Sequence, residues 1–195
     1  MKENNVKITG KIVEEPTYLM TARDGRKIYT SSIEAMRTSG KPDVIPIQVP
    51  EELAGEIWDH AGGRITLFGE YRSYNEKDGE QSHLRLYVFV KGISEAQVAD
   101  ENRVELTGYL CKQPIYRETP LGKEIADILI AVKRPYKKSD YIPGICWFGN
   151  AKQAAGLQVG TKIKVTGMIQ SRMYVKGNGE RVAYEVSVRE MEVIA

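Results

Sequence analysis

The second half of the chain alternates hydrophobic and polar residues in short runs, which is typical of strands with one buried face. The first run contains Val104, Leu106 and Leu110 and is interrupted by Gly108, where we expect a bend. Further strands are predicted at residues 123–134, 141–149, 163–169 and 181–193. The Ala-rich stretch AKQAAG predicts one or two helical turns between the third and fourth strands, and Asn178-Gly179 predicts a hairpin turn before the fifth.

Five strands with a helix between the third and fourth follow the order of an OB fold, a small closed barrel. Gly108 and Gly167 suit the tight strand coiling that closes such a barrel. The same alternation also fits another small β-barrel or a β-sandwich. The predicted class is therefore all-β, with an OB barrel as the favoured architecture.

The chain contains an internal repeat. NNVKITGKIVEEPTY, from Asn4, matches NRVELTGYLCKQPIY, from Asn102, and GRITLFGEYRSY, from Gly63, matches GTKIKVTGMIQSRMY, from Gly160. Copies of about one hundred residues are long enough to bury a core each. We therefore predict two tandem five-stranded OB domains, residues 1–98 and 99–195, joined by a short polar link near residues 95–101.

Composition narrows the function classes. The sequence holds two cysteines and two histidines and no CxxC pair, so we expect no metal site, no cofactor and no disulfide framework. No nucleophile-elbow, zinc-protease or phosphate-loop motif is present, and Asp140 and Glu180 are interpreted as turn residues, so we expect no enzyme. No apolar run is long enough for a bilayer and the N-terminus lacks a signal-like segment. We expect a cytoplasmic protein that does not enter a membrane.

Charge is distributed unevenly between the two repeats. The formal net charge is +2. Residues 1–98 hold 13 Lys and Arg against 15 Asp and Glu, which gives 13 − 15 = −2, and residues 99–195 hold 15 against 11, which gives 15 − 11 = +4. The second repeat is therefore the better candidate for binding phosphates.

The stretch RPYKKSDYIPGICWF, residues 134–148, combines cations with aromatic rings. Rings stack on unpaired bases for about 1–3 kcal/mol each, and cations follow the sugar–phosphate backbone, so this mixture fits a single-stranded nucleic acid. A tyrosine on a strand also serves packing alone, and either Trp147 or Phe148 is expected to face the core.

Residues 102–193 resemble the bacterial single-stranded DNA-binding protein family. The resemblance is carried by the N-x-V start at Asn102, by Arg117-x-Thr119-Pro120-x-Gly122, by Ala131-Val132-x-Arg134 and by Asp140-Tyr141-Ile142 running to Trp147. It implies an OB fold and sequence-independent binding and protection of single-stranded DNA in replication, recombination or repair. The first repeat resembles the family more faintly.

The resemblance also implies the residues of the binding surface. Tyr136, in the loop between the second and third strands, would stack on bases. The other implied stacking residues are Tyr141 and Trp147 on one face of the third strand and Tyr174 at the end of the fourth. The implied phosphate contacts are Lys133, Arg134, Lys137, Lys138, Arg172 and Lys176.

The first repeat departs from this pattern. It has Ser39, Val44 and Pro50 opposite the first three rings, and only Tyr74 stands near the position of Tyr174. We therefore expect residues 1–98 to bind DNA weakly or to serve assembly. The weaker candidates in this repeat are Arg37, Lys41, Tyr71, Arg72 and Tyr74.

Family members usually bring four OB barrels together, so the resemblance implies a homodimer of this two-barrel chain. The sequence ends at VREMEVIA, without the acidic tail that recruits replication proteins in many members, so we expect no recruitment by that route. Two other functions remain open: an RNA-binding protein, and an OB-fold adaptor that binds proteins in a primosome-like assembly.

Overall fold

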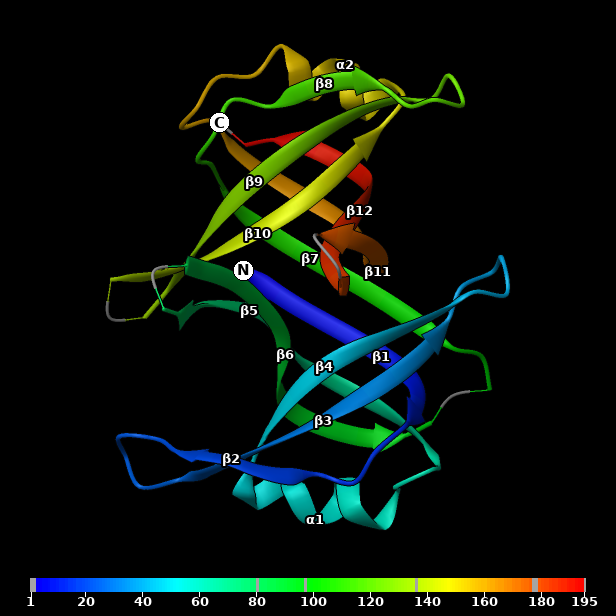
Figure 1. The fold of residues 1–195 in the computed structure, drawn as a ribbon, viewed down its shortest axis with the longest axis vertical. Helices are drawn as coiled ribbons and strands as arrows, with labels where there is room; N and C mark the ends of the chain where they lie inside the picture. The colour runs from blue at the N-terminus through cyan, green and yellow to red at the C-terminus, as the bar shows by residue number, and fades with distance from the viewer. Residues whose placement is uncertain (1–2, 80, 97, 136, 177–178, 195) are drawn as a thin grey trace. The chain divides into compact units, whose positions relative to one another are not determined.

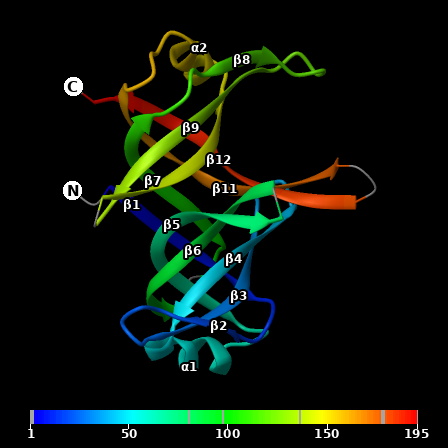
Figure 2. The same cartoon turned by 60° about the vertical axis from the view of Figure 1, so that its left-hand side comes forward.

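A computed structural model describes residues 3–79, 81–96, 98–135, 137–176 and 179–194. The chain divides into two compact units (Figures 1 and 2). The N-terminal barrel comprises residues 5–72 and 86–103, and the C-terminal barrel comprises residues 73–85 and 104–195 together with the residues up to Asn4. Within the described residues, no helix is long and apolar enough to cross a bilayer.

The N-terminal barrel is built from six strands and one helix. In sheet order the strands are β2-β3-β4-β6-β5-β1, and β3 also pairs with β1, which closes the barrel. Strands β5 and β6 continue beyond it, so their hairpin end, residues 73–85, is counted with the C-terminal barrel. The elements are β1 (Asn4–Ile12), β2 (Thr17–Thr21), β3 (Lys27–Met36), β4 (Pro42–Pro50), α1 (Glu51–Asp59), β5 (Arg64–Asp78) and β6 (Gln81–Glu95).

The C-terminal barrel repeats this plan. Its strand order is β7-β11-β12-β10-β9-β8, and β7 also pairs with β9. The elements are β7 (Glu101–Leu110), β8 (Ile115–Glu118), β9 (Glu124–Arg134), β10 (Lys138–Trp147), α2 (Gly149–Ala155), β11 (Lys162–Lys176) and β12 (Gly179–Val193). The predicted all-β class is confirmed, as are the helix between the third and fourth main strands and the tandem OB architecture. The short strands β2 and β8 were not predicted.

Each barrel buries the apolar side of its alternating strands. In the C-terminal barrel Leu106, Ile130, Ile142 and Val165 are at most 1% exposed. Removing this apolar surface from water is the main driving force for closing the barrel. The polar residues of the same strands are left on the outer face, which is where a binding surface can form.

Glycines allow the strands to approach closely where the barrel closes. A Cβ atom on Gly108 of β7 would lie 2.5 Å from the carbonyl oxygen of Ala131 on β9. Gly167 of β11 faces the carbonyl of Ser187 equally closely, beside a bulge in the β11–β12 pairing. The close approach at Gly108 belongs to the β7–β9 pairing that closes the barrel, as predicted, whereas that at Gly167 lies within the β11–β12 hairpin. Of the predicted Asn178-Gly179 turn, Asn178 lies outside the described residues.

Candidate nucleic-acid interface

The hairpin of β9 and β10 organises the candidate surface. Its two strands pair without interruption from Lys138 opposite Arg134 to Trp147 opposite Ile125. Lys137, in the turn, adopts a left-handed conformation with φ of 56°, which a tight turn requires. Tyr136, the first predicted stacking residue, lies outside the described residues.

Two tyrosines flank a small residue on the outer face. Ala131 of β9 pairs with Tyr141 of β10 on one side and with Tyr109 of β7 on the other. Neighbouring strands are about 4.8 Å apart, so the two tyrosines stand on strands roughly 9.6 Å apart, with only a methyl group between them. Tyr141 is 44% exposed. The small central residue thus leaves the Tyr141 ring open for a flat ligand, whereas Tyr109 is only partly exposed.

A lysine completes this group. The ammonium nitrogen of Lys133 lies 5.0 Å from the centre of the Tyr109 ring, within the range of a cation–π contact. Tyr109 was not predicted as a site residue. The available signal was its place after Gly108 on the polar side of β7, but its pairing with β9 follows only from closure of the barrel.

Trp147 stands at the other end of β10. It is half-buried, and its indole Nε1–H donates a 3.0 Å hydrogen bond to Ser187 Oγ on β12. Phe148 is 56% exposed and has φ of 50°, so the chain leaves the strand there and enters α2. The expectation that either Trp147 or Phe148 faces the core is therefore wrong, because the backbone turns between the strand and the helix.

Two arginines of the same unit lie beside carboxylates. Arg117 of β8 donates from Nε and Nη2 to the two carboxylate oxygens of Asp127 on β9, at 2.7 and 3.2 Å. Arg172 of β11 lies with Nε 3.7 Å from Glu185 Oε1 on β12. The guanidinium carbon of Arg172 is also 6.0 Å from the ring centre of Tyr174, which is partly exposed. Arg117 is a second residue that was not predicted as a site residue.

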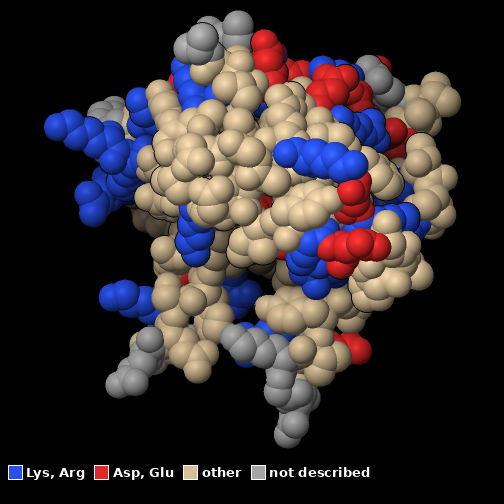
Figure 3. All heavy atoms as spheres, turned by 90° about the horizontal axis from the view of Figure 1, so that it is seen from above, with Lys and Arg blue, Asp and Glu red and all other residues tan. Residues whose placement is uncertain are grey.

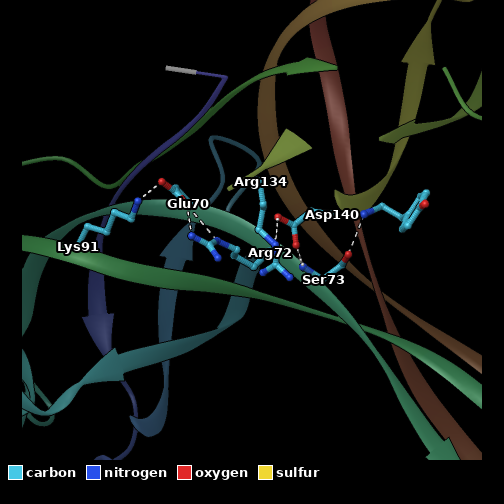
Figure 4. Close-up of polar contacts among 7 residues, drawn as sticks. Glu70, Arg72, Ser73, Lys91, Arg134 and Asp140 are labelled. Atoms are coloured by element: carbon cyan, nitrogen blue, oxygen red, sulfur yellow. Dashed lines mark hydrogen bonds and ion pairs between the residues drawn. The ribbon is translucent and has the colours of Figure 1, made fainter. Parts of the chain in front are cut away.

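The Arg134 side chain is mostly buried against Asp140, unlike the exposed cations around it. Its side chain is 19% exposed, and its Nε lies 3.3 Å from Asp140 Oδ2 (Figure 4). Asp140 is fully buried within β10, so its interpretation as a turn residue is wrong. Its Oδ1 accepts a 2.7 Å hydrogen bond from the backbone N–H of Ser73, whose hydroxyl oxygen accepts one from the N–H of Tyr141 at 2.8 Å. Arg134 thus neutralises a buried carboxylate and holds the hairpin in place.

The remaining predicted cations are lysines. Lys133, Lys137 and Lys138 are exposed around the β9–β10 turn. Lys176 ends β11, and its side chain lies outside what the structure describes. Strands β11 and β12 extend from their barrel as a two-stranded ribbon that carries Arg172 and Tyr174 (Figure 2).

The N-terminal barrel has different residues at the corresponding positions. Where the C-terminal barrel aligns Tyr109, Ala131 and Tyr141, strands β1, β3 and β4 align Lys11, Glu34 and Val44. The two rings are thus replaced by an ammonium group and an aliphatic side chain, with a carboxylate between them. A hollow at this place contains cations and carboxylates together: Lys11, Glu34, Arg37, Arg64 and Asp100.

The weaker candidates of the N-terminal repeat have other partners. Tyr71 is 1% exposed, so its ring belongs to the core and is closed to a base. Arg72 forms an ion pair with Glu70 and lies 5.4 Å from the ring centre of Phe89, and Lys91 also pairs with Glu70 (Figure 4).

Arg37 donates from Nε to the fully buried Asp43 at 2.6 Å, which repeats the Arg134–Asp140 pair. Tyr74, at 43% exposed, and the exposed Lys41 remain open to solvent. The structure therefore leaves this repeat with two accessible candidates out of five.

Charges of both signs share the surface. One face of the molecule carries Lys and Arg alone along one side and interleaves them with Asp and Glu on the other (Figure 3). Burial raises the pKa of the Glu185 carboxyl above its usual value, against the opposing pull of Arg172, and the charge of Asp127 adds to the rise. The surface near Trp147 therefore combines cations with carboxylates in direct contact.

Comparison with known proteins shows that the C-terminal half is similar to one family. Residues 101–194 match the model of the "Single-strand binding protein family". Among curated relatives, single-stranded DNA-binding protein 3 of Listeria innocua is 38% identical over 88 residues, which cover 42% of this chain and 55% of the relative. Single-stranded DNA-binding protein A of Bacillus subtilis is 35% identical over 88 residues, with 42% and 51% covered. The chain thus spans about half the length of the curated relatives it matches.

The fold comparison extends over both repeats. The crystal structure of wild-type single-stranded DNA binding protein from Thermus aquaticus covers 98% of this chain and 93% of that one, with a TM-score of 0.77 and 22% identity. A deletion mutant of the same Thermus aquaticus protein gives a TM-score of 0.78 at 21% identity. At this level of identity the likeness establishes the shared two-barrel fold.

Proposed function

We propose, from the match of residues 101–194 to the single-strand binding protein family, that the chain binds single-stranded DNA through its C-terminal barrel. Binding is independent of sequence, because ring stacking and phosphate contacts do not select a particular base. The role that follows is protection of exposed strands during replication, recombination or repair.

The observation that carries the proposal is the pair of tyrosines across Ala131. Tyr109 and Tyr141 lie on the outer face with Lys133 beside them, and Trp147 stands farther along the same hairpin. A single strand exposes flat bases at intervals and one negative charge per nucleotide. Rings separated by a small residue, with cations at their edges, match both features.

The two tryptophans of the sequence allow a direct test. Trp58 lies in α1 of the N-terminal barrel, with its ring centre 5.0 Å from that of Tyr29. In a Trp58→Phe variant, which retains an aromatic ring at that place, fluorescence reports Trp147 alone. We expect oligo-dT to quench this signal and duplex DNA of equal length to leave it nearly unchanged. Unquenched fluorescence and no shift in gel mobility at 20 mM salt would refute the proposal.

We also propose that the N-terminal barrel contributes little affinity. Its aligned Lys11, Glu34 and Val44 offer a strand no ring on which to stack, and a carboxylate stands among them. The intact chain with Lys41→Ala, the accessible candidate within residues 5–72, should therefore bind oligo-dT within about twofold of the unaltered chain. A tenfold loss would assign the N-terminal barrel a main share of binding.

The assembly we propose is a homodimer that brings four barrels together. One chain has a mass of 21.9 kDa, so light scattering should give about twice that value, roughly 44 kDa, by the closed symmetry of most oligomers. A mass of one chain at micromolar concentration would refute the dimer and leave DNA binding by each chain in place.

RNA binding and protein binding are the alternatives that the same titration separates. RNA of equal length is the first comparison, because the rings and lysines of this surface have no evident use for a 2′-hydroxyl. Salt dependence is the second comparison. A plot of the logarithm of the DNA association constant against the logarithm of salt concentration should be a straight line, and each contacted phosphate should add about −0.7 to its slope. An adaptor that binds proteins by apolar contacts would lack this dependence.

A further inference from the structure

Two arginines on the outer face of the C-terminal barrel are held by carboxylates. Arg117 donates from Nε and Nη2 to Asp127, and Arg172 lies beside Glu185. The side chains of Arg117 and Arg172 are 48% and 57% exposed, whereas that of Glu185 is 14% exposed. The two cations are therefore accessible to a ligand; Glu185 lies deeper in the surface, whereas the side chain of Asp127 is 37% exposed.

The strand register places Arg117 and Asp127 close to Trp147. Arg117 of β8 pairs with Ile125 of β9, and Ile125 pairs with Trp147 of β10, so the arginine stands two strands from the tryptophan in the same row. In the next row Ile145 is flanked by Asp127 on β9 and by Ser187 on β12. Ser187 is the residue that accepts the hydrogen bond from the Trp147 indole.

The second pair, Arg172 and Glu185, lies on β11 and β12. On β11 and β12, Gln170 pairs with Glu185 and Arg172 with Ala183, so Arg172 and Glu185 are diagonal neighbours on one face. The charges of Arg172, Asp127 and Arg117 all act on the titration of Glu185, which shows that the four groups lie within electrostatic reach of one another. The two ion pairs therefore form one group of two cations and two carboxylates, and Ser187, the hydrogen-bond partner of Trp147, lies on the same face of β12 as Glu185.

The first repeat has no counterpart of the Arg117–Asp127 pair. The internal match that places Tyr18 on Tyr116 places Leu19 on Arg117. The match that places Ile28 on Ile125 places Thr30 on Asp127. The pair thus occurs in the barrel that carries the rings and is missing at the same positions of the barrel that lacks them. Structural support of an OB barrel does not require it, which favours a role in binding.

We propose that Asp127 and Glu185 form a carboxylate gate that competes with DNA phosphates for Arg117 and Arg172. This inference rests on the proposed function and adds a regulation of the same site. The Nε–Nη2 edge of a guanidinium forms the same planar fork with a carboxylate or a phosphate, so at that edge one anion must leave before the other binds. The gate holds the arginines in place in the free protein and limits their affinity for isolated anions.

The gate has a measurable effect on both affinity and salt dependence. If Asp127 keeps Arg117, no phosphate binds there and no counterion is released. If a phosphate displaces Asp127, the phosphate releases a cation but the freed carboxylate takes one up, so the net release is small. An asparagine at position 127 leaves the arginine to the phosphate without this competition. The Asp127→Asn variant should therefore bind oligo-dT about two- to fivefold more tightly at low salt, the range of one exposed ion pair. Its salt slope should become steeper by about 0.7, the value for one phosphate on a single strand.

The experiment is a double-mutant cycle on the full chain. Affinities for oligo-dT are measured for the unaltered chain, Asp127→Asn, Arg117→Met and the double variant, with circular dichroism as the check of folding. Glu185→Gln with Arg172→Met forms a second, independent cycle. Glu190→Gln, an exposed carboxylate elsewhere on β12, is the matched control and should change the affinity less than either gate variant.

The expected result is a gain from Asp127→Asn that disappears when Arg117 is methionine. An equal gain in both backgrounds would overturn the gate, since the carboxylate would then act as a general repulsive charge. A loss of affinity in folded Asp127→Asn would also overturn it, because the carboxylate would then position the arginine for DNA. If the unaltered chain and all variants fail to bind oligo-dT, the proposed function itself is refuted.

Discussion

Replacing Tyr141 by alanine isolates the contribution of one stacking ring. The ring is 44% exposed and faces the small Ala131, so about half of it is open to a base. Its backbone N–H bonds to Ser73 Oγ, a contact that the substitution keeps. The change therefore removes ring surface and leaves the hairpin hydrogen bonds in place.

The magnitude follows from the exposed share of the ring. Stacking of one base on one aromatic side chain contributes about 1–3 kcal/mol. With about half of the ring available, we take a value of about 1.4 kcal/mol, which corresponds to a tenfold increase in the dissociation constant. Tyr141→Phe keeps the ring and should stay within about twofold of the unaltered chain.

The assay is a titration of fluorescein-labelled oligo-dT by anisotropy, at two salt concentrations. Tyr141→Ala should weaken binding by a similar factor at both, because stacking releases no counterion. If Tyr141→Ala binds like the unaltered chain while urea denaturation shows an intact fold, the ring is not a stacking residue. If Tyr141→Phe loses as much as Tyr141→Ala, the hydroxyl group and not the ring face is responsible.

Three further predictions concern stability. Asp140→Asn should lower the free energy of unfolding by about 3–5 kcal/mol in urea, because it leaves Arg134 without its buried counter-charge, and a loss under 1 kcal/mol would contradict this reasoning. Gly108→Ala should disrupt folding, since its Cβ would press on a carbonyl oxygen at 2.5 Å, whereas Gly149→Ala, with nothing within 4 Å, should be tolerated when thermal unfolding of both is compared. Burial raises the pKa of Glu185, so the folded state keeps its proton longer than the unfolded state; this contribution is complete below the unfolded value and is lost as pH rises through the raised value. Glu185→Gln should therefore remove a decline in stability above about pH 4.5, the usual value, and an unchanged pH profile of urea midpoints would speak against it.

For one candidate site residue, Tyr71, the sequence held a signal that pointed to burial. Tyr71 matches the core residue Ile169 in the repeat and shares its strand face with Ile65 and Leu67, which predicts burial. Its aromatic side chain suggested a stacking ring, but the alternation of apolar and polar residues along the strand places it on the buried face. Arg134 had no such signal, because the carboxylate that binds it belongs to a strand across a turn.

The alternation of apolar residues determined the strands, and the internal repeat determined that there are two copies of one barrel. Both follow from chemistry that is local in the chain: a strand alternates its faces with a period of two, and a copy of about one hundred residues can bury its own core. The stretch of rings and cations at residues 134–148 pointed to a single-stranded nucleic acid because these residue types are also neighbours along the chain.

Only the tertiary structure decided which charges and rings meet. Closure of the barrel pairs β7 with β9, which brings Tyr109 to Tyr141, and the register of β8 on β9 gives Arg117 its carboxylate partner. These residues are separated by 32 and 10 positions along the chain, and no local pattern links them. Neighbours across a sheet depend on strand order and register, which arise from the packing of the whole barrel and not from the sequence of any one strand.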